Sequence, residues 1–161
     1  MRKTELQMSG MPSIQKPVTA LVVAVICAVV LVPRASAQAP TPAERSKQMK
    51  IKIGSKNFIA VLDDNATAAA FKALLPMTVE MTELNGNEKY ARLSGNLPTK
   101  AANLGTIQTG DLMIYGSGTL VLFYKTFPTS YEYTRLGRVQ DSTGLAEAVG
   151  SAAVTVTFAV D

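Results

Sequence analysis

Two apolar segments on either side of Gly116-Ser117-Gly118 constrain the fold more than any other feature of the chain. The segments "DLMIY" (111–115) and "TLVLFY" (119–124) are apolar at almost every position, with no regular alternation of polar residues. Strands with this pattern are buried on both faces. The short Gly-Ser-Gly connection predicts a tight turn between them. The chain must therefore form a β-sheet whose inner hairpin is covered on both sides.

Other segments predict further strands of this sheet, because apolar residues occupy every other position along them and can face one side. They are residues 50–53, 57–62, 77–82, 131–139 and 153–160. Alternation is typical of strands with one face on a core and one face toward solvent.

Two short helices interrupt the predicted strands. Residues 64–75 are rich in alanine, begin at a capping Asp64 or Asn65 and stop before Pro76, and residues 143–149 form a second short helix. The predicted elements do not alternate as βαβ units, and the sequence has no internal repeat. It predicts a mainly β fold, a closed or nearly closed antiparallel barrel with the two helices over its ends.

The N-terminal segment resembles an export signal. Arg2, Lys3 and Lys16 precede an unbroken apolar run over residues 18–32. A basic start followed by an apolar run of about fifteen residues is typical of a signal peptide. A membrane anchor is the alternative, but the run is shorter than the ~20 residues that a bilayer span needs.

The residues after the apolar run predict a cleavage site. Ala35 and Ala37 stand at the −3 and −1 positions of a cut before Gln38. We therefore predict a signal peptide over residues 1–37, a flexible spacer over 38–48 and one barrel domain over 49–161. Translation can start at Met1, Met8 or Met11 without changing this organisation, and the predicted location is periplasmic or secreted.

The charge of the chain argues against a nucleic-acid partner. The sequence has 16 basic and 12 acidic residues and a net charge of +4. Removal of the predicted leader leaves 12 basic and 11 acidic residues, a net charge of +1. The basic character therefore belongs largely to the leader, and no basic patch for nucleic acid is expected.

The chain has no histidine, and its single cysteine, Cys27, lies in the leader. These absences exclude Ser-His-Asp and Cys-His nucleophilic sites and histidine-based zinc or iron sites. The turn around Asn85-Gly86 brings together the oxygen-bearing side chains of Glu83, Asn85, Asn87 and Glu88. Their spacing does not match a calcium-binding EF-hand loop, so no metal and no cofactor are predicted.

An aromatic cluster supplies the candidate binding residues. Tyr131, Tyr133 and Arg135 share one face of their predicted strand, and Phe127 lies on the loop before it. Two phenols and a guanidinium side by side would offer a stacking surface and a fixed cation for an anionic ligand. Alternatively, the phenols cover the outer surface of the barrel and Arg135 pairs with a neighbouring acid.

Several motifs in the same order resemble the bacterial cyclophilin-like proteins. The motifs are "GTIQTGDL" from Gly105, "LVLFY" from Leu120, "TSYEYTRLG" from Thr129 and the Gly144-Leu145 pair before the last strand. The resemblance extends over nearly all of residues 49–160 and implies a small cyclophilin-like barrel. Many members of this family have no assigned activity.

Cyclophilins themselves are prolyl isomerases, so we compared the residues that this activity needs with the residues of this chain. Their donor is an arginine in a Phe-His-Arg-Val type of strand, which matches Tyr90-Ala91-Arg92-Leu93 only at two positions. A periplasmic prolyl isomerase with Arg92 as donor is thus the alternative function. Our leading prediction is an exported, non-catalytic module that binds a peptide or small molecule near Phe127, Tyr131, Tyr133 and Arg135.

Overall fold

The computed structural model describes residues 41, 45 and 47–160 of the chain. The predicted signal peptide, with its cleavage residues Ala35, Ala37 and Gln38, lies outside the described residues. No helix among the described residues is long and apolar enough to cross a bilayer.

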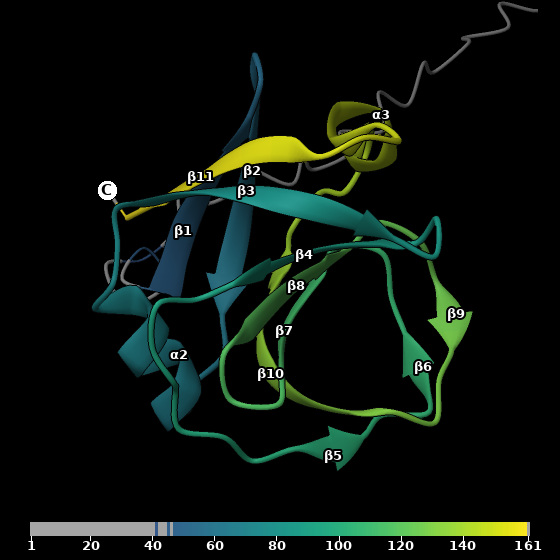
Figure 1. Ribbon diagram of the computed structural model, residues 1–161. Coiled ribbons are helices and arrows are strands. Elements are labelled where there is room, and N and C mark those ends of the chain that lie inside the picture. Colours follow the sequence, from purple (N-terminus) through teal and green to yellow (C-terminus); the bar gives the residue numbers. More distant parts are fainter. Residues whose placement is uncertain (1–40, 42–44, 46, 161) are drawn as a thin grey trace, which may run out of the picture. The chain divides into compact units, whose positions relative to one another are not determined.

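Over residues 48–160, short strands and the helices α2 and α3 make up the domain (Figure 1). In chain order the elements are β1 (Gln48–Ile53), β2 (Lys56–Leu62), α2 (Ala66–Lys72), β3 (Met77–Leu84), β4 (Glu88–Arg92), β5 (Ala102–Asn103), β6 (Thr106–Ile107), β7 (Asp111–Tyr115), β8 (Thr119–Phe123), β9 (Phe127–Pro128), β10 (Glu132–Val139), α3 (Leu145–Val149) and β11 (Val154–Ala159).

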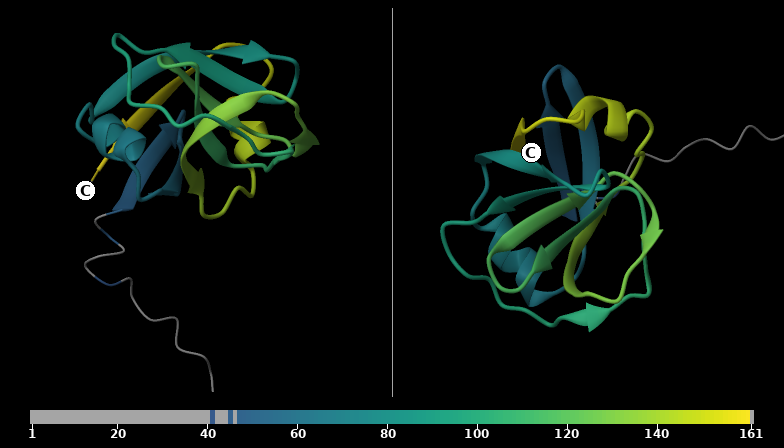
Figure 2. Two further views of the ribbon diagram at one scale, coloured as in Figure 1. Left: turned by 90° about the horizontal axis from the view of Figure 1, so that it is seen from below. Right: turned by 45° about the vertical axis from the view of Figure 1, so that its right-hand side comes forward.

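Eight of the strands described here close into an antiparallel barrel. Their order is β2-β1-β11-β3-β4-β8-β7-β10, and β10 pairs back onto β2 to complete the ring. The strand β5 adds to the end of β10, and β6 and β9 form a separate small ribbon. In Figure 1 and in the right-hand view of Figure 2, α3 and β11 lie on the side opposite to β5. The predicted mainly β barrel is confirmed.

The hairpin of β7 and β8 is buried on both faces, as its sequence predicts. Leu112, Ile114, Leu120 and Leu122 belong to the main core. The residues between them face a second, smaller apolar cluster, whose buried members are Ile107, Met113, Val121, Phe123 and Tyr133. The second cluster exists because the ribbon of β6 and β9 covers the outer face of this hairpin. That covered outer face is where the candidate site lies.

The first helix is shorter than predicted but begins at the predicted cap. The Oδ1 atom of Asn65 accepts a hydrogen bond of 2.8 Å from the backbone N–H of Ala68. Phe71 is fully buried and packs edge-to-face on Phe158, with ring centroids 5.9 Å apart. After the helix, the N–H groups of Leu74 and Leu75 each donate a hydrogen bond to the carbonyl three residues earlier, which forms a tighter turn before Pro76.

Two predicted turns have the backbone that their residues favour. Asn85 and Gly86 both have positive φ, 56° and 68°, between β3 and β4. The Oε1 atom of Glu83 accepts a hydrogen bond of 2.8 Å from the N–H of Gly86, which fixes this turn. The Gly-Ser-Gly segment joins β7 to β8 as a hairpin turn, with Tyr115 opposite Thr119. Both turns border the candidate site.

Candidate functional site

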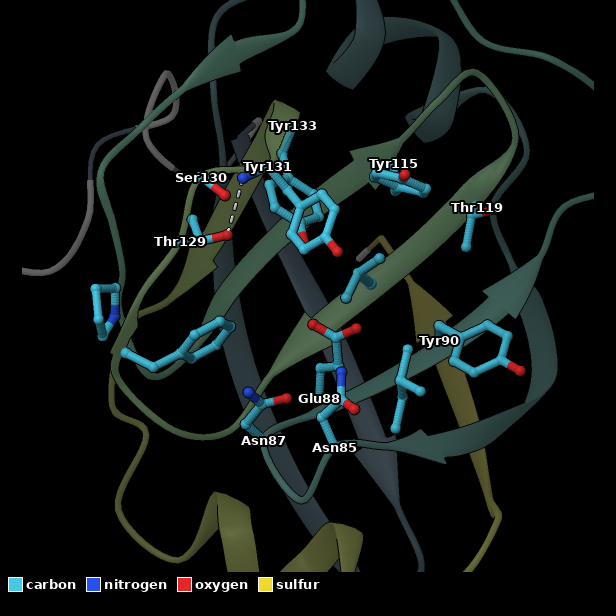
Figure 3. A pocket seen from close by; sticks show the side chains of 14 residues that line it. Asn85, Asn87, Glu88, Tyr90, Tyr115, Thr119, Thr129, Ser130, Tyr131 and Tyr133 are labelled. Carbon is cyan, nitrogen blue, oxygen red and sulfur yellow. Dashed lines mark hydrogen bonds between the residues drawn. The ribbon is translucent and has the colours of Figure 1, made fainter.

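A pocket of about 530 Å³ lies on the outer face of the barrel (Figure 3). Its floor is the outer face of β4, β8, β7 and β10, and the β9 segment and the loop after it form one wall. The lining residues are Leu84, Asn85, Asn87, Glu88, Tyr90, Tyr115, Thr119, Val121, Phe127, Pro128, Thr129, Ser130, Tyr131 and Tyr133.

Strand alternation and register place the floor residues. Glu88 and Tyr90 are two residues apart on β4, so both side chains point to the outer face. Tyr90 lies opposite Val121 on β8, and Glu88 lies opposite Phe123. Side chains directly opposite each other on neighbouring strands come within contact distance. The pocket therefore contains side chains that the sheet itself holds in position.

Aromatic rings form a continuous series along one side of the pocket. The ring of Tyr115 is 6.3 Å from that of Tyr131 and 5.6 Å from that of Tyr133, measured between centroids. Phe123 is 5.4 Å from Tyr133 and 5.7 Å from Phe127 in the same measure. These spacings are those of mutually packed aromatic pairs. The rings brace one another and form a pre-built apolar wall.

The two tyrosines at the start of β10 differ in exposure. Tyr133 is only 6% exposed, whereas Tyr131 is 63% exposed and stands at the pocket mouth. The Oγ1 atom of Thr129 accepts a hydrogen bond of 3.1 Å from the N–H of Tyr131, which orders the loop (Figure 3). Burial, and secondly the charge of Glu88, raises the pKa of Tyr133 to about 12. The Tyr133 phenol is therefore neutral at physiological pH.

The carboxyl group of Glu88 is the one acidic group of the pocket lining. It is 7% exposed, and Figure 3 shows its carboxylate directed into the pocket. Within the described part of the chain, its side chain forms neither a hydrogen bond nor an ion pair. Burial, followed by the nearby charge of Glu83, raises the pKa of Glu88. The pocket thus holds a largely buried acid that has no partner among the described residues.

The adjacent residue on β4, Lys89, is a cation, but its side chain is held on the other face of the strand. Lys89 is fully buried, its Nζ lies 2.5 Å from Oε2 of Glu83, and it donates a hydrogen bond of 2.6 Å to the carbonyl of Ala152. The phenol of Tyr124 donates to Oε1 of Glu83 at 2.8 Å. Burial alone would raise the pKa of Glu83, but its contacts with Lys89 and Tyr124 lower it. Lys89 therefore neutralises Glu83, and Glu88 is left without a counter-ion.

Comparison with protein-family models decides the relationship of this chain. Residues 51–159 match the model of the cyclophilin-like family. The chain belongs to the cyclophilin-like family. The solution structure of a hypothetical protein from Archaeoglobus fulgidus is similar at a TM-score of 0.49 and 17% identity, covering 71% of this chain and 95% of that one. Comparison with curated protein sequences gave no match.

This cyclophilin-like domain brings together three of the four predicted binding residues. Phe127, Tyr131 and Tyr133 all line the pocket. Arg135 does not: its Nε donates a hydrogen bond of 3.1 Å to Oδ2 of Asp63, and it lines a separate cavity of about 400 Å³ next to α2. Tyr133 borders both cavities. The pairing of Arg135 with a neighbouring acid, the alternative considered above, is what the structure shows.

The candidate isomerase donor lies at the rim of the pocket. Arg92 is exposed on β4, and its Nη1 is 3.5 Å from Oγ1 of Thr119, a lining residue. Arg92 itself does not line the pocket. Among the described residues, no arginine lines the aromatic pocket.

Sequence reasoning missed Glu88, Tyr90 and Tyr115 as members of the site. Glu88 was considered only as an oxygen ligand of the preceding turn. Its position at the start of β4, two residues before Tyr90, carried a usable signal, because both then share the outer face. Among the described residues, no group of three or more acidic, histidine or cysteine side chains is arranged to hold a metal ion.

Proposed function

We propose that this protein is an exported binding module that holds a small molecule, or one side chain of a peptide, in the pocket on the outer face of the barrel. The proposal rests on one observation, a concave, largely aromatic pocket of about 530 Å³ on the outer face of the barrel sheet. Ligand sites are typically clefts of about 300–1,000 Å³ with apolar walls and a few fixed polar groups. Export is inferred from the leader sequence.

The arrangement of the pocket supports binding more than it supports catalysis. Its aromatic wall offers stacking area, and its tyrosine hydroxyls add polar contacts at the same surface. Glu88 is the only ionisable lining side chain apart from the tyrosines, and no basic group among the described lining residues could act with it. A single acid of this kind can orient a ligand, whereas acid–base chemistry usually requires a second positioned group.

Tyrosine fluorescence offers a direct measurement of binding. The chain has five tyrosines and no tryptophan, and Tyr90, Tyr115, Tyr131 and Tyr133 all line the pocket. A non-fluorescent ligand that enters the pocket is therefore expected to change the emission. Suitable probes are cyclohexylmethylammonium, cyclohexylmethanol and cyclohexanecarboxylate, which differ mainly in charge.

We expect at least one of these probes to bind saturably with a Kd of about a millimolar, as suits ligands of this size. Tyr131→Ala should weaken that binding by about tenfold, because it removes the exposed side of the aromatic wall. Leu74→Ala is the matched control, since Leu74 is also exposed but lies outside the pocket lining. Absence of saturable binding by all three probes, or an unchanged Kd in the folded Tyr131→Ala variant, contradicts the proposal.

A further inference from the structure

We propose that the pocket selects an organic cation, an ammonium or guanidinium group on an apolar stem. The charged end lies against the carboxylate of Glu88, and the stem lies along the rings of Tyr115 and Tyr131. This inference rests on the proposed binding function and names the chemical class of its ligand.

Glu88 supplies the first argument for a cationic ligand. The residue is more than nine-tenths buried, and its side chain points into the pocket and has no partner within the described residues. A buried carboxylate without a partner is unfavourable, because it loses hydration without gaining an ion pair or hydrogen bonds. A ligand that brings a positive charge to this position restores both interactions, and a charge-assisted hydrogen bond is among the stronger contacts that a pocket can offer.

A second unpartnered acceptor lies at the same end of the pocket. The Oδ1 atom of Asn87 is buried and accepts no hydrogen bond from any described residue, and Asn87 lines the pocket next to Glu88. Two acceptors that lack donors predict a ligand with several donors. An ammonium group has three donors and no acceptor, and a guanidinium has five.

The remaining lining selects against anions and accommodates the apolar stem of a cation. None of the fourteen described lining residues is lysine or arginine. Arg92 is four residues from Glu88 along β4, about 13 Å at ~3.3 Å per residue, so it does not replace the missing counter-ion. The tyrosine rings have negative faces that attract cations within about 6 Å. Charge, hydrogen bonding and ring electrostatics therefore favour the same class of ligand.

Two sources can present this chemistry, a free amine and the lysine side chain of a peptide. Cyclohexylmethylammonium represents the first, and the blocked peptide acetyl-Gly-Lys-Gly-amide represents the second. Acetyl-Gly-norleucine-Gly-amide is the control for the peptide, because norleucine has the same stem without the charged nitrogen. The tighter of the two cationic probes identifies the source, and either result supports a cationic ligand.

The decisive experiment compares cyclohexylmethylammonium with cyclohexylmethanol, which has the same shape and no charge. We expect the ammonium to bind about tenfold more tightly to the wild-type protein at neutral pH, with cyclohexanecarboxylate weakest. In Glu88→Gln the preference for the ammonium should fall to about twofold or less, while the affinity for the alcohol stays the same. Glu80→Gln removes an exposed acid outside the pocket and should retain the full preference.

The outcomes separate this inference from the binding function. Equal or tighter binding of the alcohol to the wild-type protein, lost in Tyr131→Ala, overturns the cation inference and leaves the binding function standing. Failure of every probe to bind overturns both. The wild-type comparison decides the matter even if Glu88→Gln does not fold, and thermal unfolding of that variant shows whether it does.

Discussion

Replacing Gly137 with alanine is expected to destabilise the barrel by about 3 kcal/mol or more. A β-carbon at this position would lie 2.3 Å from the carbonyl oxygen of Val61 and 3.0 Å from the Cα of Leu62. Both atoms belong to the backbone of β2, so no side chain can turn away to make room. The clash lies where β10 pairs with β2 and closes the ring. Urea unfolding of the two proteins measures the loss.

Gly137 is crowded because its strand, β10, is paired with β7 on one side and with β2 on the other. The register between β10 and β7 shifts between Arg135 and Gly137, so the regular pairing of β10 with β7 is interrupted just before Gly137. Gly95→Ala is the matched control, because a β-carbon at Gly95 meets no atom within 4 Å and the residue does not require positive φ. Gly95→Ala should change stability by less than about 0.5 kcal/mol. Similar unfolding midpoints for the two variants would show that the β2–β10 seam is not as tightly packed as described.

Lys89→Met is expected to destabilise the protein by about 3 kcal/mol. Methionine occupies a similar volume, so the loss comes from Glu83, which keeps its charge but loses the ammonium at 2.5 Å. The carbonyl of Ala152 also loses its donor. Lys52→Met serves as the control, because Lys52 is exposed on β1 and should tolerate the change within about 0.5 kcal/mol.

A second substitution tests the cause of this loss. In the double variant Lys89→Met, Glu83→Gln the uncompensated charge is gone, so stability should recover by about 1 kcal/mol or more over the single variant. An additive double variant, with no recovery, would mean that the buried lysine acts through packing alone. Because the ion pair lies on the face of β4 opposite to Glu88, its loss is not expected to change the ligand preference of the folded protein.

Local sequence pattern predicted most of the barrel strands but not the elements that cover the site. The strands β7 and β8 were predictable because each is apolar at every position after its first residue. The strands β5, β6 and β9 have two residues each, which is too short to show an alternation of apolar and polar residues. Only their pairing with other strands defines them. The β9 residues Phe127 and Pro128 nevertheless line the pocket, and β6 pairs with β9 behind them, which local pattern could not indicate.

Contacts between residues distant in sequence decided which predicted site residues came together. Tyr131, Tyr133 and Arg135 were grouped because they share one face of a strand. The partner of Arg135 is Asp63, 72 positions earlier in the chain, and no local pattern reveals that pair. The neighbour of Glu88 across the sheet is Phe123 on β8, and this pairing too joins residues distant in sequence. Alternation therefore predicted the face of a side chain, but not what lies over that face.

The most direct test of the pocket as the ligand site is an NMR titration of the ¹⁵N-labelled protein with the tightest of the three cyclohexyl probes. The pocket model predicts that the largest amide shifts cluster at Glu88, Tyr90, Tyr115 and Tyr131 and saturate with one common Kd. Shifts centred instead on Asp63 and Arg135, around the second cavity, would contradict it, as would shifts scattered over the surface without saturation.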